Sequence, residues 1–194
     1  MTDARARDEA SARDAAMMTL FLGFFASAWF SWAQAAPPDP WRAPLDIAAF
    51  AALAVAVVGG VQAWRHRSDG SVLAAPGAMR AYNIIVAVEF ASCALGALAL
   101  GWSGHAQYIP VWVALVVGAH FWPLAPLLAN RLLVPLGAVL VVAAAAGLAA
   151  GVSDTMTPSA PTGAVAGASL LVGAAAPLRT AVGAHRSRVR TTRS

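Results

Sequence analysis

Residues 82–128 decide the fold of this chain, and they read YNIIVAVEFASCALGALALGWSGHAQYIPVWVALVVGAHFWPLAPLL. They contain two apolar runs, 83–102 and 108–128, separated by the short segment 103–107. A helix needs about 20 mostly apolar residues to cross the hydrocarbon core of a bilayer, and each run has that length. The stretch therefore predicts a transmembrane helical hairpin.

Two ionisable side chains lie inside this hairpin, Glu89 in its first run and His120 in its second. Both lie nearly equally far from the middle of the turn, so antiparallel packing would place them at the same depth. A charged acid at the centre of a membrane helix costs about 2.5–3.5 kcal/mol on insertion scales, so Glu89 is expected to face other helices. With Ser92 and Cys93 on the same face, these residues predict an intramembrane polar site. Two interpretations stay open: a proton or cation site, and one interhelical hydrogen bond that sets the register of the hairpin.

Two prolines follow His120 on the second helix of the hairpin. Pro123 and Pro126 have no backbone N–H, so the carbonyls of Ala119 and Trp122 lose their usual helical donors. Such a pair predicts a kink between His120 and Pro126.

Residues 118–125 read GAHFWPLA. Together with Glu89 on the preceding helix, this segment resembles a group of small bacterial multi-pass membrane proteins that carry a G-x-H-F-x-P-L-A run. The resemblance covers the hairpin and implies that it is a recurring unit of bacterial membrane proteins. No activity is established for that group, so no residue role carries over.

The composition extends the membrane interpretation to the whole chain. Of its 194 residues 59% are hydrophobic and 11% are charged, whereas soluble domains carry about 25% charged residues. Four further apolar runs cover residues 17–36, 45–64, 132–151 and 161–178. The predicted fold is all-α, an integral membrane bundle of six transmembrane helices over residues 17–178.

Two GxxxG motifs, 147–151 and 163–167, lie in the last two predicted spans. Glycines at this spacing let helix backbones approach closely, although such motifs also arise by chance in Ala- and Gly-rich membrane helices. Packing within the bundle is the favoured interpretation, and homodimerisation is the alternative.

The flanking segments predict the orientation. Residues 1–16 mix acids and arginines and read as a solvated cytoplasmic tail, while residues 179–194 carry five arginines and no acid. Six spans place twelve of the thirteen arginines on the side of the two termini, and Arg42 alone lies opposite. The positive-inside rule then places both termini in the cytoplasm of a bacterial cell. The basic tail is expected to contact anionic lipid.

Common catalytic and cofactor-binding motifs are missing from the sequence, which contains no P-loop, GxSxG, HExxH or CxxC. No catalytic residue, metal site or cofactor is predicted. The basic tail lacks the aromatic residues or folded basic face of a nucleic-acid site. The four histidines belong to separate segments, which argues against a shared metal: His66, His105, His120 and His185.

Three classes of function remain, and the sequence favours the two that are not enzymes. The favoured one is a small accessory or scaffolding protein of the plasma membrane, whose partner is a second copy or another membrane protein. The alternative is a small permease or proton- or ion-coupled transporter that uses Glu89 and His120. The third is a membrane enzyme acting on a lipid or quinone. A water-filled path to Glu89 and His120 would favour transport. A Glu89–His120 pair closed to water, together with an exposed apolar helix face, would favour the accessory protein. A polar cleft open to lipid would favour the enzyme.

Overall fold

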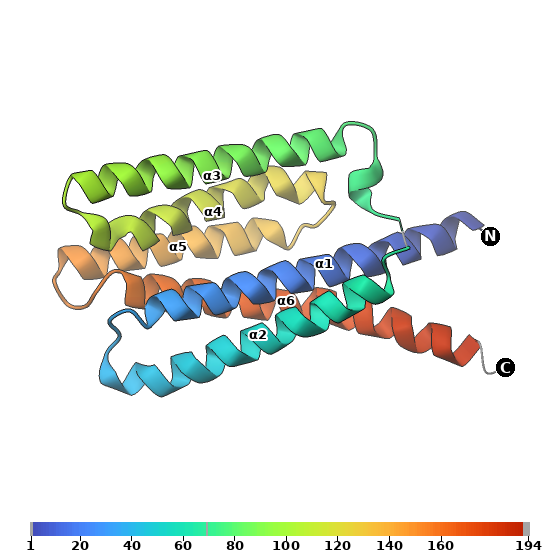
Figure 1. The fold of residues 1–194 in the computed structure, drawn as a ribbon, viewed down its shortest axis with the longest axis horizontal. Helices are drawn as coiled ribbons and strands as arrows, with labels where there is room; N and C mark the ends of the chain where they lie inside the picture. Colours follow the sequence, from blue (N-terminus) through green and yellow to red (C-terminus); the bar gives the residue numbers. More distant parts are fainter. Residues whose placement is uncertain (1, 69, 192–194) are drawn as a thin grey trace.

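Six long α-helices make up the computed structural model, which describes residues 2–68 and 70–191 (Figure 1). They are α1 Thr2–Ala33, α2 Arg42–Arg65, α3 Ala78–Trp102, α4 Ile109–Leu127, α5 Leu133–Val152 and α6 Ser159–Thr191. Within the described residues there is no β-strand. All six helices are long and apolar enough to cross a membrane. Each predicted span lies on one of them, so the all-helical prediction is confirmed.

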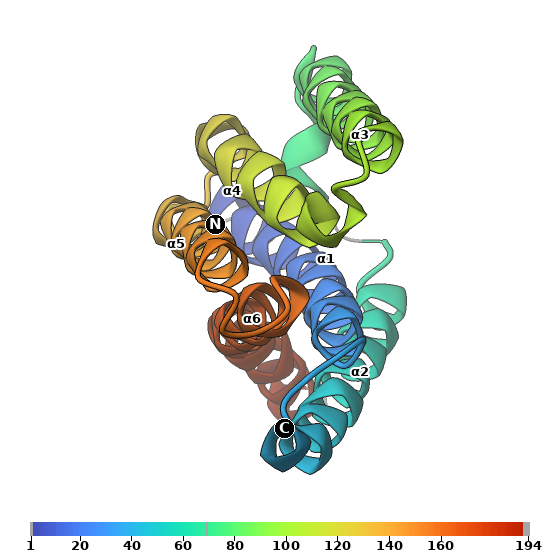
Figure 2. The same cartoon turned by 90° about the vertical axis from the view of Figure 1, so that its left-hand side faces the viewer.

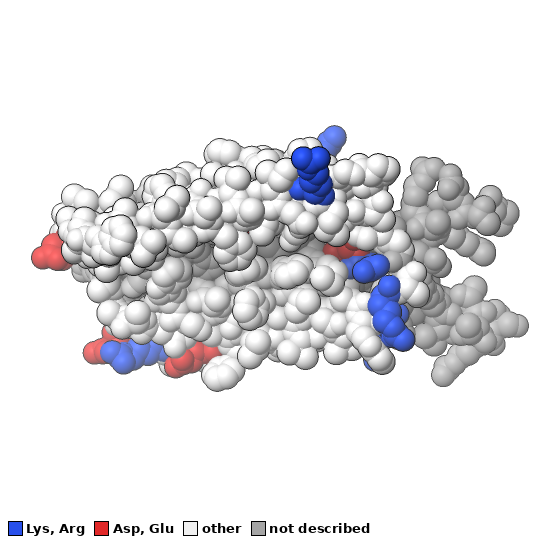
Figure 3. All heavy atoms as spheres, turned by 45° about the horizontal axis from the view of Figure 1, so that its top comes forward, with Lys and Arg blue, Asp and Glu red and all other residues white. Residues whose placement is uncertain are grey.

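The helices are arranged as a close-packed group with one helix at its edge. α1 lies between α2 and α6, α5 packs on α6, α4 on α5, and α3 chiefly on α4 (Figures 1 and 2). Both ends of the chain lie at the same end of the bundle (Figure 1). Charged side chains on the face drawn in Figure 3 gather towards its two ends, with a broad uncharged band between them. That distribution fits an apolar membrane interior between two polar surfaces.

Close helix contacts depend on glycines. On α1 and α2, a Cβ at Gly23 would lie 2.7 Å from the backbone nitrogen of Ala56, and one at Gly59 would lie 2.5 Å from that of Leu20. On α4 and α5, a Cβ at Gly137 would lie 2.5 Å from the carbonyl oxygen of Gly118. Helices associate in membranes largely through such close packing, because lipid tails are as apolar as the side chains.

Both GxxxG motifs face neighbouring helices of the same chain. Gly147 and Gly151 on α5 lie against Pro158, at the start of α6. Gly163 and Gly167 on α6 lie against Trp29 and Phe30 of α1. The motifs therefore serve packing within the bundle, the favoured of the two interpretations.

The N-terminal segment differs from the expected solvated tail. α1 already begins at Thr2, and Ala12 and Ala16 are fully buried. The carboxylate of Asp14 accepts hydrogen bonds from the Ser71 hydroxyl (2.7 Å) and the Val72 backbone N–H (2.9 Å), in the α2–α3 connection. The first helix therefore begins well before the predicted boundary at residue 16, and Asp14, one of the four acids of that segment, has a structural partner.

The C-terminal boundary also shifts. α6 continues as a helix from Ser159 to Thr191, so the segment predicted as a basic tail from residue 179 is helical over most of its length. Residues 192–194 lie outside the described residues.

α4 remains α-helical through Pro123 and Pro126 and ends at Leu127. The two prolines leave the carbonyls of Ala119 and Trp122 without backbone donors four residues on. The kink predicted for this segment stays a prediction.

Candidate intramembrane polar site

The structure brings Glu89 of α3 and His120 of α4 into contact. Oε1 of Glu89 lies 3.3 Å from Nδ1 of His120, and the two side chains are 15% and 13% exposed. The short α3–α4 connection makes the helices antiparallel neighbours, and the equal offsets from the turn then place the two groups at one depth. The pair lies at the helix interface, as expected for an acid within a membrane segment.

His120 has a second acceptor at the same ring nitrogen. Nδ1 also lies 2.9 Å from the carbonyl oxygen of Val117, one turn earlier on α4. Two acceptors at one nitrogen favour the tautomer with a proton on Nδ1, which then donates mainly to Val117 and secondarily to Glu89. The ring also packs edge-on against Phe121, with centroids 4.9 Å apart. These contacts set the orientation of the imidazole towards α3.

Ser92 takes part in the site through its backbone. The indole N–H of Trp112 on α4 donates to the carbonyl oxygen of Ser92 at 2.9 Å. A Cβ at Gly96, one turn further along α3, would collide with the Trp112 indole. Gly96 therefore makes room for the ring that forms the second polar contact between the two helices.

Cys93 is a half-buried free thiol on the same face of α3. Its side chain makes no hydrogen bond to any described residue. Of the four residues that the sequence placed in the site, Glu89 and His120 thus contact each other, Ser92 contributes a carbonyl, and Cys93 only borders them.

Trp112 was missed by sequence reasoning. A signal existed, because Gly96 lies one turn from Ser92 on the face of α3 that carries Glu89. Nothing in the sequence, however, states which of the many apolar and aromatic residues of α4 fills the space above a glycine.

The remaining histidines lie away from this site. His105 is in the α3–α4 connection, with Nδ1 3.3 Å from the Ser103 hydroxyl, and His66 is buried at the end of α2. The side chain of His185 lies outside the described residues. Across the side chains that are described, no three His, Cys, Asp or Glu residues form a metal-ligand group.

Two grooves on the surface of the bundle lie elsewhere. One follows α5 and α6, and the other lies between Trp32, Gln107 and Thr157 at the end of the bundle opposite the termini. Neither is lined by Glu89 or His120. No family model, curated protein or solved structure is detectably similar to this chain.

Proposed function

We propose that this chain is an accessory protein of the bacterial plasma membrane that binds another membrane protein through the exposed face of α3. The observation that carries this proposal is that α3, 25 residues long, has no buried residue. Every other helix of the described bundle contributes residues to the buried core. A long apolar helix attached on one side only has its opposite face available to a neighbour in the bilayer.

One stripe along the exposed face of α3 has the small residues of a helix-packing surface, beside larger exposed side chains such as Val88 and Leu95. Ala87, Ala91 and Ala94 are exposed and follow one another at helical spacing, with exposed Asn83 one turn before them. Ala91 is two residues from Glu89, which places it about 160° away around an α-helix. Small residues allow close approach of two helices in a membrane, and an asparagine adds an interhelical hydrogen bond.

Asn83 strengthens this assignment because its amide makes no hydrogen bond to any described residue. A polar side chain on a membrane helix is stabilised when a neighbouring helix supplies a partner. We call Asn83, Ala87, Ala91 and Ala94 the outer stripe of α3. The Glu89–His120 and Trp112–Ser92 contacts on the other side of the helix would hold this stripe at a defined angle.

Site-specific photo-crosslinking in native membranes tests the proposal. A diazirine amino acid at Ala87 or Ala91 should give one discrete protein adduct, while the same probe at Phe50 of α2, which is 72% exposed, serves as the matched control. Replacing Ala91 with Leu should abolish the adduct formed from position 87, because a larger side chain keeps the partner helix away.

Two results would contradict the proposal. Lipid adducts alone at positions 87 and 91 would show that the stripe faces bilayer, and equal protein adducts at Phe50 would show random collision. An adduct with the mass of two chains, also formed in liposomes that hold only this protein, would identify the partner as a second copy.

Both termini are proposed to face the cytoplasm, supported by the arginine distribution and the common end of the bundle at which the termini lie. In a variant with Cys93 replaced by Ser, a cysteine at Gly70 should react with an impermeant thiol reagent only from the cytoplasm. A cysteine at Asp154, in the exposed α5–α6 turn, should react only from outside. Opposite labelling would reverse the orientation.

A proton-coupled transporter is the second candidate, and the incomplete burial of Glu89 and His120 favours it. A carboxylate and an imidazole in contact can exchange a proton, and the prolines of α4 free two backbone acceptors nearby. Proton flux into liposomes that contain the purified chain distinguishes the candidates. A flux that is lost in Glu89→Gln, with the fold retained, would support transport, whereas the accessory role requires no flux in either protein.

A further inference from the structure

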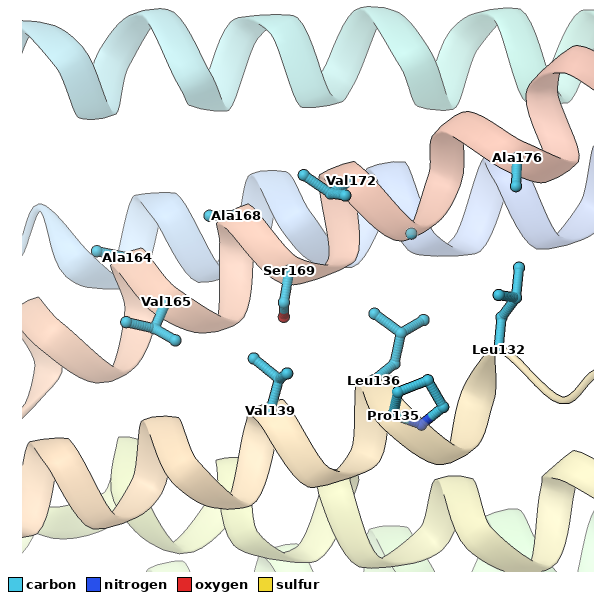
Figure 4. Close-up of a pocket in the computed structure, with 11 residues that line it drawn as sticks. Leu132, Pro135, Leu136, Val139, Ala164, Val165, Ala168, Ser169, Val172 and Ala176 are labelled. Carbon is cyan, nitrogen blue, oxygen red and sulfur yellow. The ribbon is translucent and has the colours of Figure 1, made fainter.

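A groove runs between α5 and α6 on a side of the bundle that the outer stripe of α3 does not share. Its volume is about 690 Å³. Figure 4 shows Leu136 and Val139 of α5 facing Val165 and Ser169 of α6 across this space, and Leu132, which directly precedes α5, lies opposite Ala176. Gly173 takes part in its floor, where a Cβ would lie 2.8 Å from Leu136.

The lining of the groove is apolar. Ser169 carries the one polar side chain among the lining residues, and its hydroxyl already donates to the carbonyl of Ala166 at 2.8 Å. No lining side chain therefore offers a free hydrogen-bond donor. Such a surface suits a saturated or unsaturated hydrocarbon chain.

The groove is slightly longer than the hydrocarbon part of one leaflet of a bilayer. On α6 it extends from Ala164 to Ala176, which at 1.5 Å per residue is about 18 Å. Half of a hydrocarbon core of about 30 Å is about 15 Å. The groove begins at the start of α5, at the end of the bundle where both chain termini lie, and on α6 it passes the middle of the span Ser159–Thr180.

Two arginines flank the mouth of the groove. Leu132 and Ala176 face each other at one end (Figure 4), and Arg131 directly precedes the former, while Arg179 follows the latter by one helical turn. Both arginines are exposed. Neither forms a side-chain hydrogen bond or ion pair with a described residue. Two unneutralised guanidinium groups at the polar end of an apolar groove match the phosphate of a lipid.

We infer that the α5–α6 groove is a binding site for an anionic phospholipid, with one acyl chain along the groove and the phosphate between Arg131 and Arg179. The charges distinguish this occupant from a second copy of the chain, because an arginine-flanked face would repel its own copy. The site is separate from the outer stripe of α3, so it holds whether or not that stripe binds a protein.

Photo-crosslinking lipids test this inference on the full chain in nanodiscs. One sample contains phosphatidylglycerol with a diazirine in its acyl chain, and the other contains phosphatidylcholine with the same chain. Peptide mapping should place the phosphatidylglycerol adduct on the two segments that line the groove, residues 132–139 and 164–176. Phosphatidylcholine should label these segments several-fold less.

Two sets of variants separate the headgroup from the acyl chain. Arg131→Gln with Arg179→Gln should lower the preference for phosphatidylglycerol, by about fivefold for each arginine removed. Arg65→Gln with Arg80→Gln removes two exposed arginines elsewhere on the same side and should leave the preference unchanged. Ala168→Phe should fill the groove and reduce labelling by both lipids, while Ala175→Phe, exposed on α6 outside the groove, should not.

Three outcomes would overturn the inference: equal labelling by both lipids, an equal loss of preference in the two arginine variants, or adducts spread over all six helices. A chain-to-chain adduct through α5 and α6 that Ala168→Phe abolishes would assign the groove to a second copy instead.

Discussion

The α1–α2 pair and the α3–α4 pair are both antiparallel helical hairpins, yet different forces hold them together. Gly23 and Gly59 bring the backbones of α1 and α2 into direct contact, and residues of both helices are buried. α3 buries no residue against α4. It meets α4 through the Glu89–His120 pair and the Trp112–Ser92 hydrogen bond.

The contrast between glycine packing and polar contacts indicates how a helix at the edge of a bundle is held in place. Where small residues line both partners, van der Waals contact over many atoms suffices. Where a helix packs chiefly on one neighbouring helix, as α3 does on α4, two polar contacts supply both part of the affinity and the rotational register. The comparison predicts a graded series of mutational effects.

The largest effect is expected at Gly59. In Gly59→Ala the new Cβ would lie within 2.9 Å of three backbone atoms of Thr19 and Leu20, so α1 and α2 must separate. Overpacking of this kind costs about 1–3 kcal/mol, and rigid backbone on the other side places this change at the upper end. Unfolding in detergent with increasing SDS measures it.

Gly60→Ala is the matched control, because its Cβ would lie 3.7 Å from the flexible Cδ1 of Leu20. Equal stability of the two variants would show that the close approach of α1 and α2 does not hold the pair together.

A smaller effect is expected at Gly96. In Gly96→Ala the Trp112 indole must move and lose its hydrogen bond to Ser92, a contact worth about 0.6–2 kcal/mol in a membrane. The distance between spin labels on α3 and α4 should broaden, while labels on α1 and α2 should keep theirs. Gly101→Ala on the same helix, with no neighbouring atom within 4 Å, should change neither distance.

The Glu89–His120 pair should contribute still less. In Glu89→Gln the amide oxygen can still accept from the imidazole, so stability is expected to change by less than about 1 kcal/mol. A double-mutant cycle with Glu89→Ala and His120→Ala measures the coupling of the two side chains, for which we expect about 0.6 kcal/mol. A coupling energy of zero would mean that the 3.3 Å contact contributes nothing to hairpin stability.

The smallest change in stability is expected at the prolines of α4. Pro123→Ala with Pro126→Ala returns backbone donors to the carbonyls of Ala119 and Trp122, and the helix should straighten. Spin labels near the two ends of α4 should then move further apart. An unchanged distance would show that the prolines introduce no bend.

Much of the site could be predicted because it depends on short-range constraints. The brief connection after Trp102 forces α3 and α4 to be antiparallel neighbours, and equal offsets then place Glu89 beside His120. Trp112 could not be predicted in the same way, since its position depends on which rotamer fills the space above Gly96. The burial of Ala12 and the bonds of Asp14 escaped prediction because their partners are distant in sequence.

The sequence by itself determined that the chain forms six long apolar helices, because apolar runs of about 20 residues can satisfy their backbone in a bilayer only as helices. It also determined which ends carry the arginines. The tertiary structure alone decided that α3 lies at the edge, that α5 and α6 leave a groove open, and that both GxxxG motifs face inward. The reason is physical: helices of nearly uniform hydrophobicity carry little directional signal, and the shape complementarity between small and large side chains selects each neighbour.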